Sequence, residues 1–233
     1  MSNYTLGIKE LDNLIGGIKK GSNLMLIGPP MSGKELILYN IMYHGASKNE
    51  NAVILVNNRE PAKYVLEWFE ENKLELPLSR IGIVDCVTRT HNGGQVESET
   101  IKIASGPIDL SCIGVKISQF FDNFFMKKNI REIQLHINSL STMLMYSNIQ
   151  TVFRFTHVFA GRIKAAGALG IYMVESGMTD EQTIAAFKQL FNGMIEIKSE
   201  NDKNFIRVVV EFQSKPTPWF EYEIEKGSVR IVG

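Results

Sequence analysis

Apolar and polar positions follow two periods along this chain, and each period predicts a different kind of element. Apolar runs predict buried strands at 24–27, 52–56, 80–84 and 168–174. The segment 132–137, in which Gln134 and His136 alternate with apolar residues, predicts another buried strand. Apolar residues at helical spacing predict helices between them, at 36–43, 60–71, 113–127, 151–166 and 180–191. Strands and helices that alternate in this way are typical of a mostly parallel sheet flanked by helices.

In the last part of the chain the period becomes two, which indicates strands with one buried face. The segments 195–197, 205–212 and 219–224 are predicted to be closely spaced antiparallel strands, and 227–232 a final edge strand. The polar segment 88–106 contains an Asn-Gly-Gly sequence, which predicts a mobile loop whose role the sequence does not reveal.

Length and composition favour a single α/β domain spanning residues 1–233. Lys plus Arg and Asp plus Glu both number 25, so the net charge is zero, which argues against strong non-specific binding to nucleic acid. The two cysteines, Cys86 and Cys112, share neither a metal-site nor a redox spacing. The N-terminus lacks a signal-peptide pattern, and no apolar run approaches the ~18 residues of a membrane span. We therefore expect a cytoplasmic protein without membrane contact.

A glycine-rich segment joins the first predicted strand to the helix that follows it. It matches the phosphate-loop (P-loop) pattern G-x-x-x-x-G-K and continues with Glu35, where the pattern has Ser or Thr. Its glycines let backbone N–H groups surround phosphate oxygens, and the helix N-terminus adds its positive end. We expect Lys34 to reach the β and γ phosphates. The predicted nucleotide-binding residues are Gly28, Pro29, Pro30, Met31, Ser32, Gly33, Lys34, Glu35 and Leu36.

The segment before the P-loop adds a second signature. Residues 6–22, LGIKELDNLIGGIKKGS, resemble the segment that leads into the P-loop in the RecA superfamily, particularly in its KaiC-like and RadA-like branch. The branch has the pattern G-x-x-x-L-D-x-L-x-G-G-x-x-x-G at this spacing. The resemblance extends over nearly the whole chain and implies a RecA-like P-loop NTPase core that binds ATP or ADP. It also implies assembly into rings or filaments, with nucleotide between neighbouring subunits.

Two substitutions affect the metal site that this resemblance implies. Glu35 replaces the hydroxyl that ligates Mg²⁺. Asn138 replaces the Asp that ends the fourth strand of the core and orients the hydration shell of Mg²⁺, although Ser139 and the residues after it match the Ser-Leu-Ser of the family. An amide brings no charge to offset this hard cation, so Asn138 and Ser139 form a degenerate Walker B motif. We expect nucleotide binding with little dependence on Mg²⁺.

Two further substitutions affect the groups that act on the γ-phosphate. Arg59 stands at the first of two adjacent acids, one of which activates the attacking water in the family. Glu60 remains, either as a possible general base or as an acid at the start of a helix. Residues 211–214, EFQS, occupy the place of a K-x-R-G motif whose basic pair reaches the phosphate bound by a neighbouring subunit.

Together these substitutions predict very slow hydrolysis or none. Phosphoryl transfer depends on positioning and electrostatic stabilisation, and removing one stabiliser typically costs on the order of 10²–10³ in rate. The alternative to nucleotide binding is that the P-loop is only a turn between strand and helix, or a binding site for another anion. Glu175 and Asn138 both end predicted strands, where open α/β sheets place ligands, so Glu175 is a candidate to compensate for Asn138.

The function that these features favour is a nucleotide-binding regulatory protein of the KaiC-like type, with weak or no hydrolysis. It would act on a regulatory protein partner through its nucleotide state, or through self-association or assembly with a related RecA-like protein. Three alternatives stay open. The first is an active ATPase that uses Glu35, Glu60 or Glu175 in unusual roles, the second a recombinase-like accessory protein that binds DNA or a partner ATPase, and the third a non-catalytic structural subunit.

Overall fold

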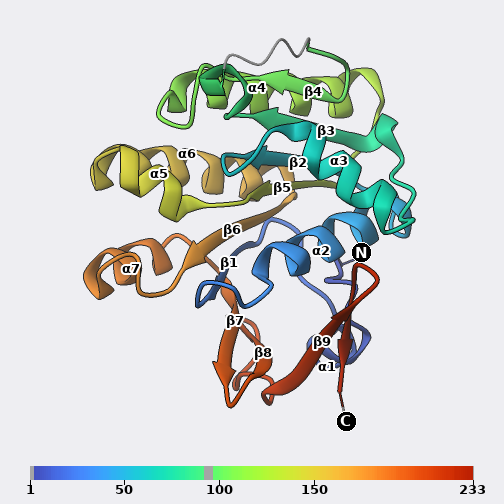
Figure 1. Cartoon of the computed structure of the whole chain (residues 1–233), viewed down its shortest axis with the longest axis vertical. Helices are drawn as coiled ribbons and strands as arrows, with labels where there is room; N and C mark the ends of the chain where they lie inside the picture. The colour runs from blue at the N-terminus through green and yellow to red at the C-terminus, as the bar shows by residue number, and fades with distance from the viewer. Residues whose placement is uncertain (1–2, 92–96, 233) are drawn as a thin grey trace.

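The carboxyl ends of a row of parallel strands meet along one edge of the sheet, and this edge carries the candidate site (Figure 1). The computed structural model describes residues 3–91 and 97–232. Its strands form one sheet in the order β10-β9-β8-β7-β1-β6-β5-β2-β3-β4. Their bounds are β1 Asn23–Gly28, β2 Ala52–Asn57, β3 Ile81–Asp85, β4 Ile101–Ile103, β5 Ile133–Ile137, β6 Leu169–Glu175, β7 Gly193–Glu200, β8 Lys203–Val210, β9 Phe220–Glu225 and β10 Ser228–Ile231.

The strand pairing follows the two hydrophobic periods of the sequence. Strands from β7 through β1, β6, β5, β2 and β3 to β4 pair in parallel. The central ones are buried along their whole length, as expected for strands covered on both faces. Strands β7, β8, β9 and β10 pair antiparallel, and buried and less buried residues alternate along β8. The predicted α/β architecture with C-terminal antiparallel strands is confirmed.

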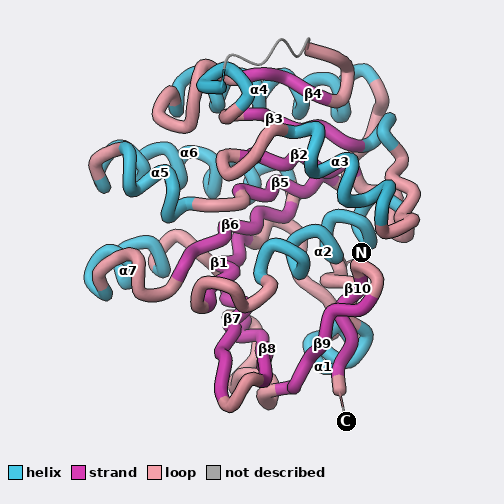
Figure 2. The backbone as a smooth tube through the Cα atoms, in the orientation of Figure 1, coloured by secondary structure: helices cyan, strands magenta, loops and turns pink. Residues whose placement is uncertain are grey.

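Helices cover both faces of the parallel part of the sheet (Figure 2). Helices α1, α2 and α3 contribute to one apolar core, and α4, α5, α6 and α7 to the other. Their bounds are α1 Lys9–Ile15, α2 Lys34–Ser47, α3 Ala62–Glu71, α4 Leu110–Asp122, α5 Leu140–Tyr146, α6 Ile149–Ala166 and α7 Glu181–Lys188, with short helical turns η1 Leu78–Arg80, η2 Thr88–His91 and η3 Asn123–Lys127. Among the residues that the structure describes, no helix is long and apolar enough to cross a bilayer.

The structure corrects several sequence-based predictions. The segment 88–106 is not a loop throughout, because η2 and the edge strand β4 lie within it and β4 pairs with β3. Residues 92–96 of that segment lie outside the described residues. Helices α1 and α5 were not predicted at all, since each is only 7 residues long and so shows little periodicity. The helix predicted at 113–127 begins earlier, because the Asp109 side chain accepts a hydrogen bond from the N–H of Cys112, and it ends in the π-helical turn η3.

Candidate functional site

The P-loop has a defined shape held by contacts from two sides. Ser32 Oγ donates a hydrogen bond of 2.8 Å to the carbonyl of Pro29 within the loop. The hydroxyl of Tyr222, on β9, donates to the carbonyl of Ser32. Gly33 has a φ of 75°, in the region that favours glycine, and a Cβ atom there would lie 2.6 Å from the side chain of Ile224. The loop therefore turns into α2 at Gly33, and residues of β9 contact both the loop and this turn.

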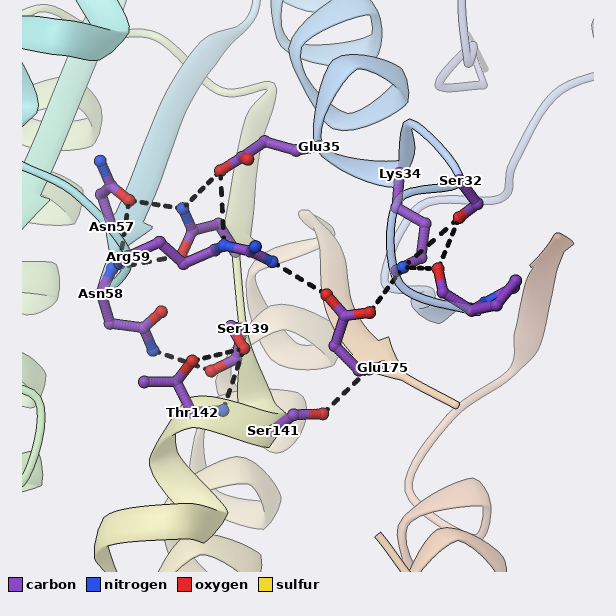
Figure 3. A network of polar contacts seen from close by, with 12 residues as sticks. Ser32, Lys34, Glu35, Asn57, Asn58, Arg59, Ser139, Ser141, Thr142 and Glu175 are labelled. Atoms are coloured by element: carbon purple, nitrogen blue, oxygen red, sulfur yellow. Dashed lines mark hydrogen bonds and ion pairs between the residues drawn. The ribbon is translucent and has the colours of Figure 1, made fainter. Parts of the chain in front are cut away.

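Lys34 is the first residue of α2, and its side chain is nearly fully buried. Its Nζ donates to the carbonyl of Pro29 and to Glu175 Oε2, the latter at 2.8 Å, and lies 3.4 Å from Ser32 Oγ. Figure 3 shows the lysine turned back over the loop toward the carboxylate. The P-loop lysine is thus paired with an anion that the chain itself supplies.

Glu175 reaches Lys34 because of the register between two strands. Strands β1 and β6 are parallel neighbours, and Glu175, which ends β6, lies opposite Gly28, which ends β1. The N–H of Glu175 donates to Ser141 Oγ at 2.9 Å, and the next N–H, of Ser176, donates to the Gly28 carbonyl at 2.8 Å. These bonds fix the backbone of Glu175 beside the P-loop.

A second cation pairs with the same carboxylate. Arg59 Nη1 donates to Glu175 Oε1 at 2.9 Å, so the carboxylate lies between the guanidinium and Lys34 (Figure 3). Burial opposes ionisation of Glu175, but the hydrogen bonds and charges of Lys34 and Arg59 outweigh it and hold the pKa of this carboxyl below its ordinary value. Glu175 is therefore ionised at neutral pH.

Glu35 and Asn138, the two residues predicted to stand in place of metal-site residues, lie close together in the structure. Asn138 Nδ2 donates to the Oδ1 of Asn57 and lies 3.4 Å from Glu35 Oε1, while Asn138 Oδ1 accepts from the N–H of Asn58 at 3.1 Å. Burial raises the pKa of Glu35 above its ordinary value, and the nearby charge of Arg59 opposes this rise. Arg59 Nε lies 4.0 Å from Glu35 Oε1.

These groups do not fit a magnesium ion at the P-loop. Mg²⁺ requires oxygen ligands around it in near-ideal octahedral geometry. Here the side-chain oxygen of Asn138 accepts a hydrogen bond from the backbone N–H of Asn58, and its NH₂ group faces Glu35. Arg59 brings a permanent positive charge to the same carboxylate. Hydrogen-bond donors and a cation thus already face the oxygen atoms that a metal ion would need.

Other predicted residues lie farther from this network. Glu60 accepts a hydrogen bond of 3.1 Å from the hydroxyl of Tyr39, so its carboxylate has a partner other than Lys34. Leu36 is partly buried and packs against the apolar core rather than standing free at the loop. The side chain of Met31 is fully exposed. Ser139 caps α5, where its Oγ accepts from the N–H of Thr142 at 2.9 Å.

A cleft of about 620 Å³ opens beside the network. It lies at the carboxyl ends of the parallel strands, where open α/β sheets bind ligands. Its polar wall includes Asn58, Arg59, Ser139 and Glu175, and its other walls are largely apolar. Arg59, which is partly exposed and lines this cleft, therefore connects the buried Lys34–Glu175 pair to a solvent-accessible surface.

The strand order, with the P-loop sequence between β1 and α2, matches solved KaiC-like proteins, so the chain has a KaiC-like, RecA-like fold. Residues 21–197 match the Family of unknown function (DUF7504), and the chain belongs to that family. No curated protein matches the sequence.

Solved structures with the same fold support this class. A KaiC-like protein from the hyperthermophilic archaeon Pyrococcus horikoshii OT3 superposes with a TM-score of 0.74 and 14% identity, over 100% of this chain and 99% of its own. An uncharacterized protein from Pyrococcus horikoshii in complex with an unknown peptide has a TM-score of 0.74 and 18% identity, with 99% of both chains covered. At these identities the likeness concerns the fold.

Sequence reasoning missed two residues that shape the site. In the sequence Arg59 indicates only the loss of an acid, whereas in the structure it pairs with Glu175. Tyr222 is predicted only to lie in a strand, whereas in the structure its hydroxyl donates a hydrogen bond to the P-loop. For Arg59 a signal existed, since a cation that replaces an acid at a strand end changes the charge of the site. For Tyr222 the sequence carries none, because the contact depends on how the C-terminal strands fold back.

Proposed function

We propose that this chain binds the phosphate groups of ATP or ADP at its P-loop and hydrolyses them very slowly or not at all. One observation carries the proposal: Lys34 is buried in a formed P-loop and already neutralises an anionic group, the carboxylate of Glu175. A buried lysine at a helix N-terminus is a preorganised site for an anion. The match of fold to P-loop NTPases makes a nucleotide the first candidate for that anion.

The groups around the P-loop support weak turnover. Hydrolysis needs charge stabilisation that acts on the transition state and a base or positioned group that orients the attacking water. Glu60 is held by Tyr39, and Asn138 and Arg59 occupy the positions at which the family resemblance implies acids. Each of these differences removes an interaction that lowers the barrier.

A site that binds without turnover suits a regulatory role. Its occupancy follows the concentration of the nucleotide rather than the progress of a reaction. The network joins the ends of β2, β5 and β6 through Asn57, Asn138 and Glu175, so ligand binding there would act on the loops that follow three strands. We propose that a second copy of the chain, a related RecA-like protein or another regulatory partner reads this state.

The first test is calorimetric titration of the purified chain with ATP and with ADP, in Mg²⁺ and in EDTA, with phosphate release measured in parallel. We expect binding in both media, little phosphate release, and loss of binding in Lys34→Ala. Lys48→Ala serves as the matched control, since Lys48 is an exposed residue just after the last turn of the same helix. A thermal melt of each variant shows whether it is folded. Unchanged affinity in a folded Lys34→Ala variant contradicts the proposal.

Other outcomes identify the alternative functions. Rapid Mg²⁺-dependent phosphate release that Glu60→Gln abolishes would identify an active ATPase. A salt-sensitive mobility shift with single-stranded DNA would identify a nucleic-acid-binding accessory protein. Affinity for nucleotide that arises only in the presence of a related subunit would identify a structural role within a mixed assembly.

A further inference from the structure

Two cations share a single carboxylate at the mouth of the P-loop. Glu175 Oε2 accepts from Lys34 Nζ at 2.8 Å, and Glu175 Oε1 accepts from Arg59 Nη1 at 2.9 Å. A phosphate group offers the same arrangement, with several charged oxygens on one centre to bind several charged donors. In chemical terms, the Glu175 carboxylate occupies the place of a phosphate group.

Arg59 brings the charge that a metal ion would bring to this site. Its guanidinium lies between two carboxylates: Nη1 is 2.9 Å from Glu175 Oε1, and Nε is 4.0 Å from Glu35 Oε1. Arginine remains protonated at all physiological pH values, and its planar group suits carboxylate and phosphate oxygens. A permanent cation therefore lies beside Lys34 in a position where the surrounding side chains do not fit Mg²⁺.

The three charged groups differ in their freedom to move. The side chains of Lys34 and Glu175 are only 3% and 9% exposed, whereas that of Arg59 is 40% exposed. The backbone of Glu175 is fixed by its neighbours, but its side chain lines the cleft at the strand ends. The carboxylate therefore has space to turn into when another anion takes its place, and Arg59 can follow the incoming group.

We propose that Glu175 is a built-in competitor for the phosphate groups of a nucleotide, and that Arg59 is the second cation of the phosphate site, in place of a metal ion. This inference rests on the proposed nucleotide-binding function. A phosphate group displaces the Glu175 carboxylate, and Lys34 and Arg59 then bind the phosphate together. Because Arg59 supplies the second charge, binding does not require Mg²⁺.

The test compares the affinities of the full chain and two charge-removing variants for ATP, by calorimetry in Mg²⁺ and in EDTA. Glu175→Gln removes the competing charge and keeps the shape of the side chain, so we expect affinity to rise by about tenfold or more. Arg59→Gln removes a charged donor, and we expect affinity to fall by about tenfold or more. Glu67→Gln and Arg154→Gln are the matched controls, because both residues are exposed on helices and neither contacts the network.

The outcomes separate this inference from the function on which it rests. If the unmodified chain binds ATP and Glu175→Gln binds it no more tightly, the competitor role is wrong while the proposed function stands. If Arg59→Gln binds as the unmodified chain does, or Mg²⁺ strengthens binding of the unmodified chain more than tenfold, Arg59 is not the second cation. If neither the unmodified chain nor Glu175→Gln binds ATP, the nucleotide function itself fails and the inference fails with it.

A second measurement covers the possibility that Glu175→Gln is unstable. Melting temperatures in increasing inorganic phosphate should rise more for Glu175→Gln than for the unmodified chain, because the variant leaves Lys34 and Arg59 without their anion. Glu175→Asp provides a milder change, since its shorter side chain cannot bridge both cations. The melting temperature of this variant should also rise more with phosphate than that of the unmodified chain. Equal phosphate responses in all three proteins overturn the competitor role.

Discussion

Lys34 and Glu175 are 141 positions apart in the chain, and their charges meet in a nearly dry environment. Removing two charged groups from water is costly, and mutual attraction repays that cost only when the geometry and the remaining hydrogen bonds are good. Here Lys34 also bonds to the Pro29 carbonyl, and Glu175 also bonds to Arg59. Removing Glu175 therefore leaves Lys34 without a carboxylate, and removing Lys34 leaves Glu175 with Arg59 as its one cation among the pairs described above.

A double-mutant cycle measures this dependence. Lys34→Met and Glu175→Gln, alone and together, should show a coupling in the free energy of unfolding of roughly 1–3 kcal/mol, because the pair is nearly buried and Glu175→Gln leaves Lys34 without a carboxylate. Urea unfolding monitored by circular dichroism gives the values. The control is the exposed pair Lys20–Glu132, 2.7 Å apart with side chains 36% and 38% exposed. Its coupling should be only roughly 0.2–1 kcal/mol, and equal couplings in the two pairs would contradict the prediction.

At the scale of elements, β5 contains a buried histidine inside the parallel sheet. His136 is fully buried, as predicted for this strand, and its Nε2 is 2.9 Å from Gln134 Oε1. Its Nδ1 has no hydrogen-bond partner within the described part of the chain. Burial alone lowers the pKa of His136 to about 3, so the folded protein keeps this imidazole neutral.

This histidine should make folding sensitive to mild acid. The unfolded chain binds a proton at His136 once the pH falls below the ordinary histidine pKa of 6.5, whereas the folded chain binds it only near its lowered pKa of about 3. Because the unfolded state then binds more protons, stability that is present at higher pH is lost as the pH falls. The loss is about 2 kcal/mol between about pH 8 and about pH 5. In urea unfolding at both pH values, the free energy of unfolding of His136→Gln should fall with acid by about 2 kcal/mol less than that of the unmodified chain.

His157→Gln is the control for this prediction, since His157 is exposed on α6. The control variant should lose stability with acid as the unmodified chain does. His44, whose pKa burial lowers as well, contributes in the same direction in every one of these proteins and therefore cancels in the comparison. Equal acid sensitivity in His136→Gln and the unmodified chain would show that His136 is protonated in the folded state.

At the scale of the whole molecule, the C-terminal strands and the P-loop form one structure. Strand β7 extends the parallel sheet beside β1, and β8 and β9 continue it antiparallel until the chain returns to α2 (Figure 1). There the hydroxyl of Tyr222 holds the Ser32 carbonyl, and the N–H of Val229 donates to Asn40 on α2 at 3.2 Å. The last strands thus support the start and the middle of the helix that carries Lys34.

Tyr222→Phe tests this support. It removes one buried hydrogen bond to the P-loop and leaves the ring in place, so the free energy of unfolding should fall by about 1–2 kcal/mol. ATP affinity should fall several-fold as well, because the loop loses a contact that fixes its shape. Tyr64→Phe, at an exposed tyrosine on α3, should change neither quantity. A loss of stability without any change in affinity would show that Tyr222 supports the fold but not the phosphate site.

Local patterns in the sequence were sufficient to predict the class of fold and the position of the P-loop. Apolar runs, helical spacing and the change to a period of two are local properties of the chain, so they identified the parallel and antiparallel parts of the sheet and the turn into α2. Short elements such as α1 and the edge strand β4 escaped this reasoning, since a few residues carry too little periodicity.

The contacts of Lys34, in contrast, follow from the arrangement of the whole sheet. The sequence marked Glu175 as the end of a strand and Arg59 as a substituted acid, but their meeting depends on the order of the strands and on the register that sets Glu175 opposite Gly28. Charges on separate elements interact strongly only when folding brings them within a few ångströms in a nearly dry site. That distance is a property of the assembled sheet and not of any segment of the chain.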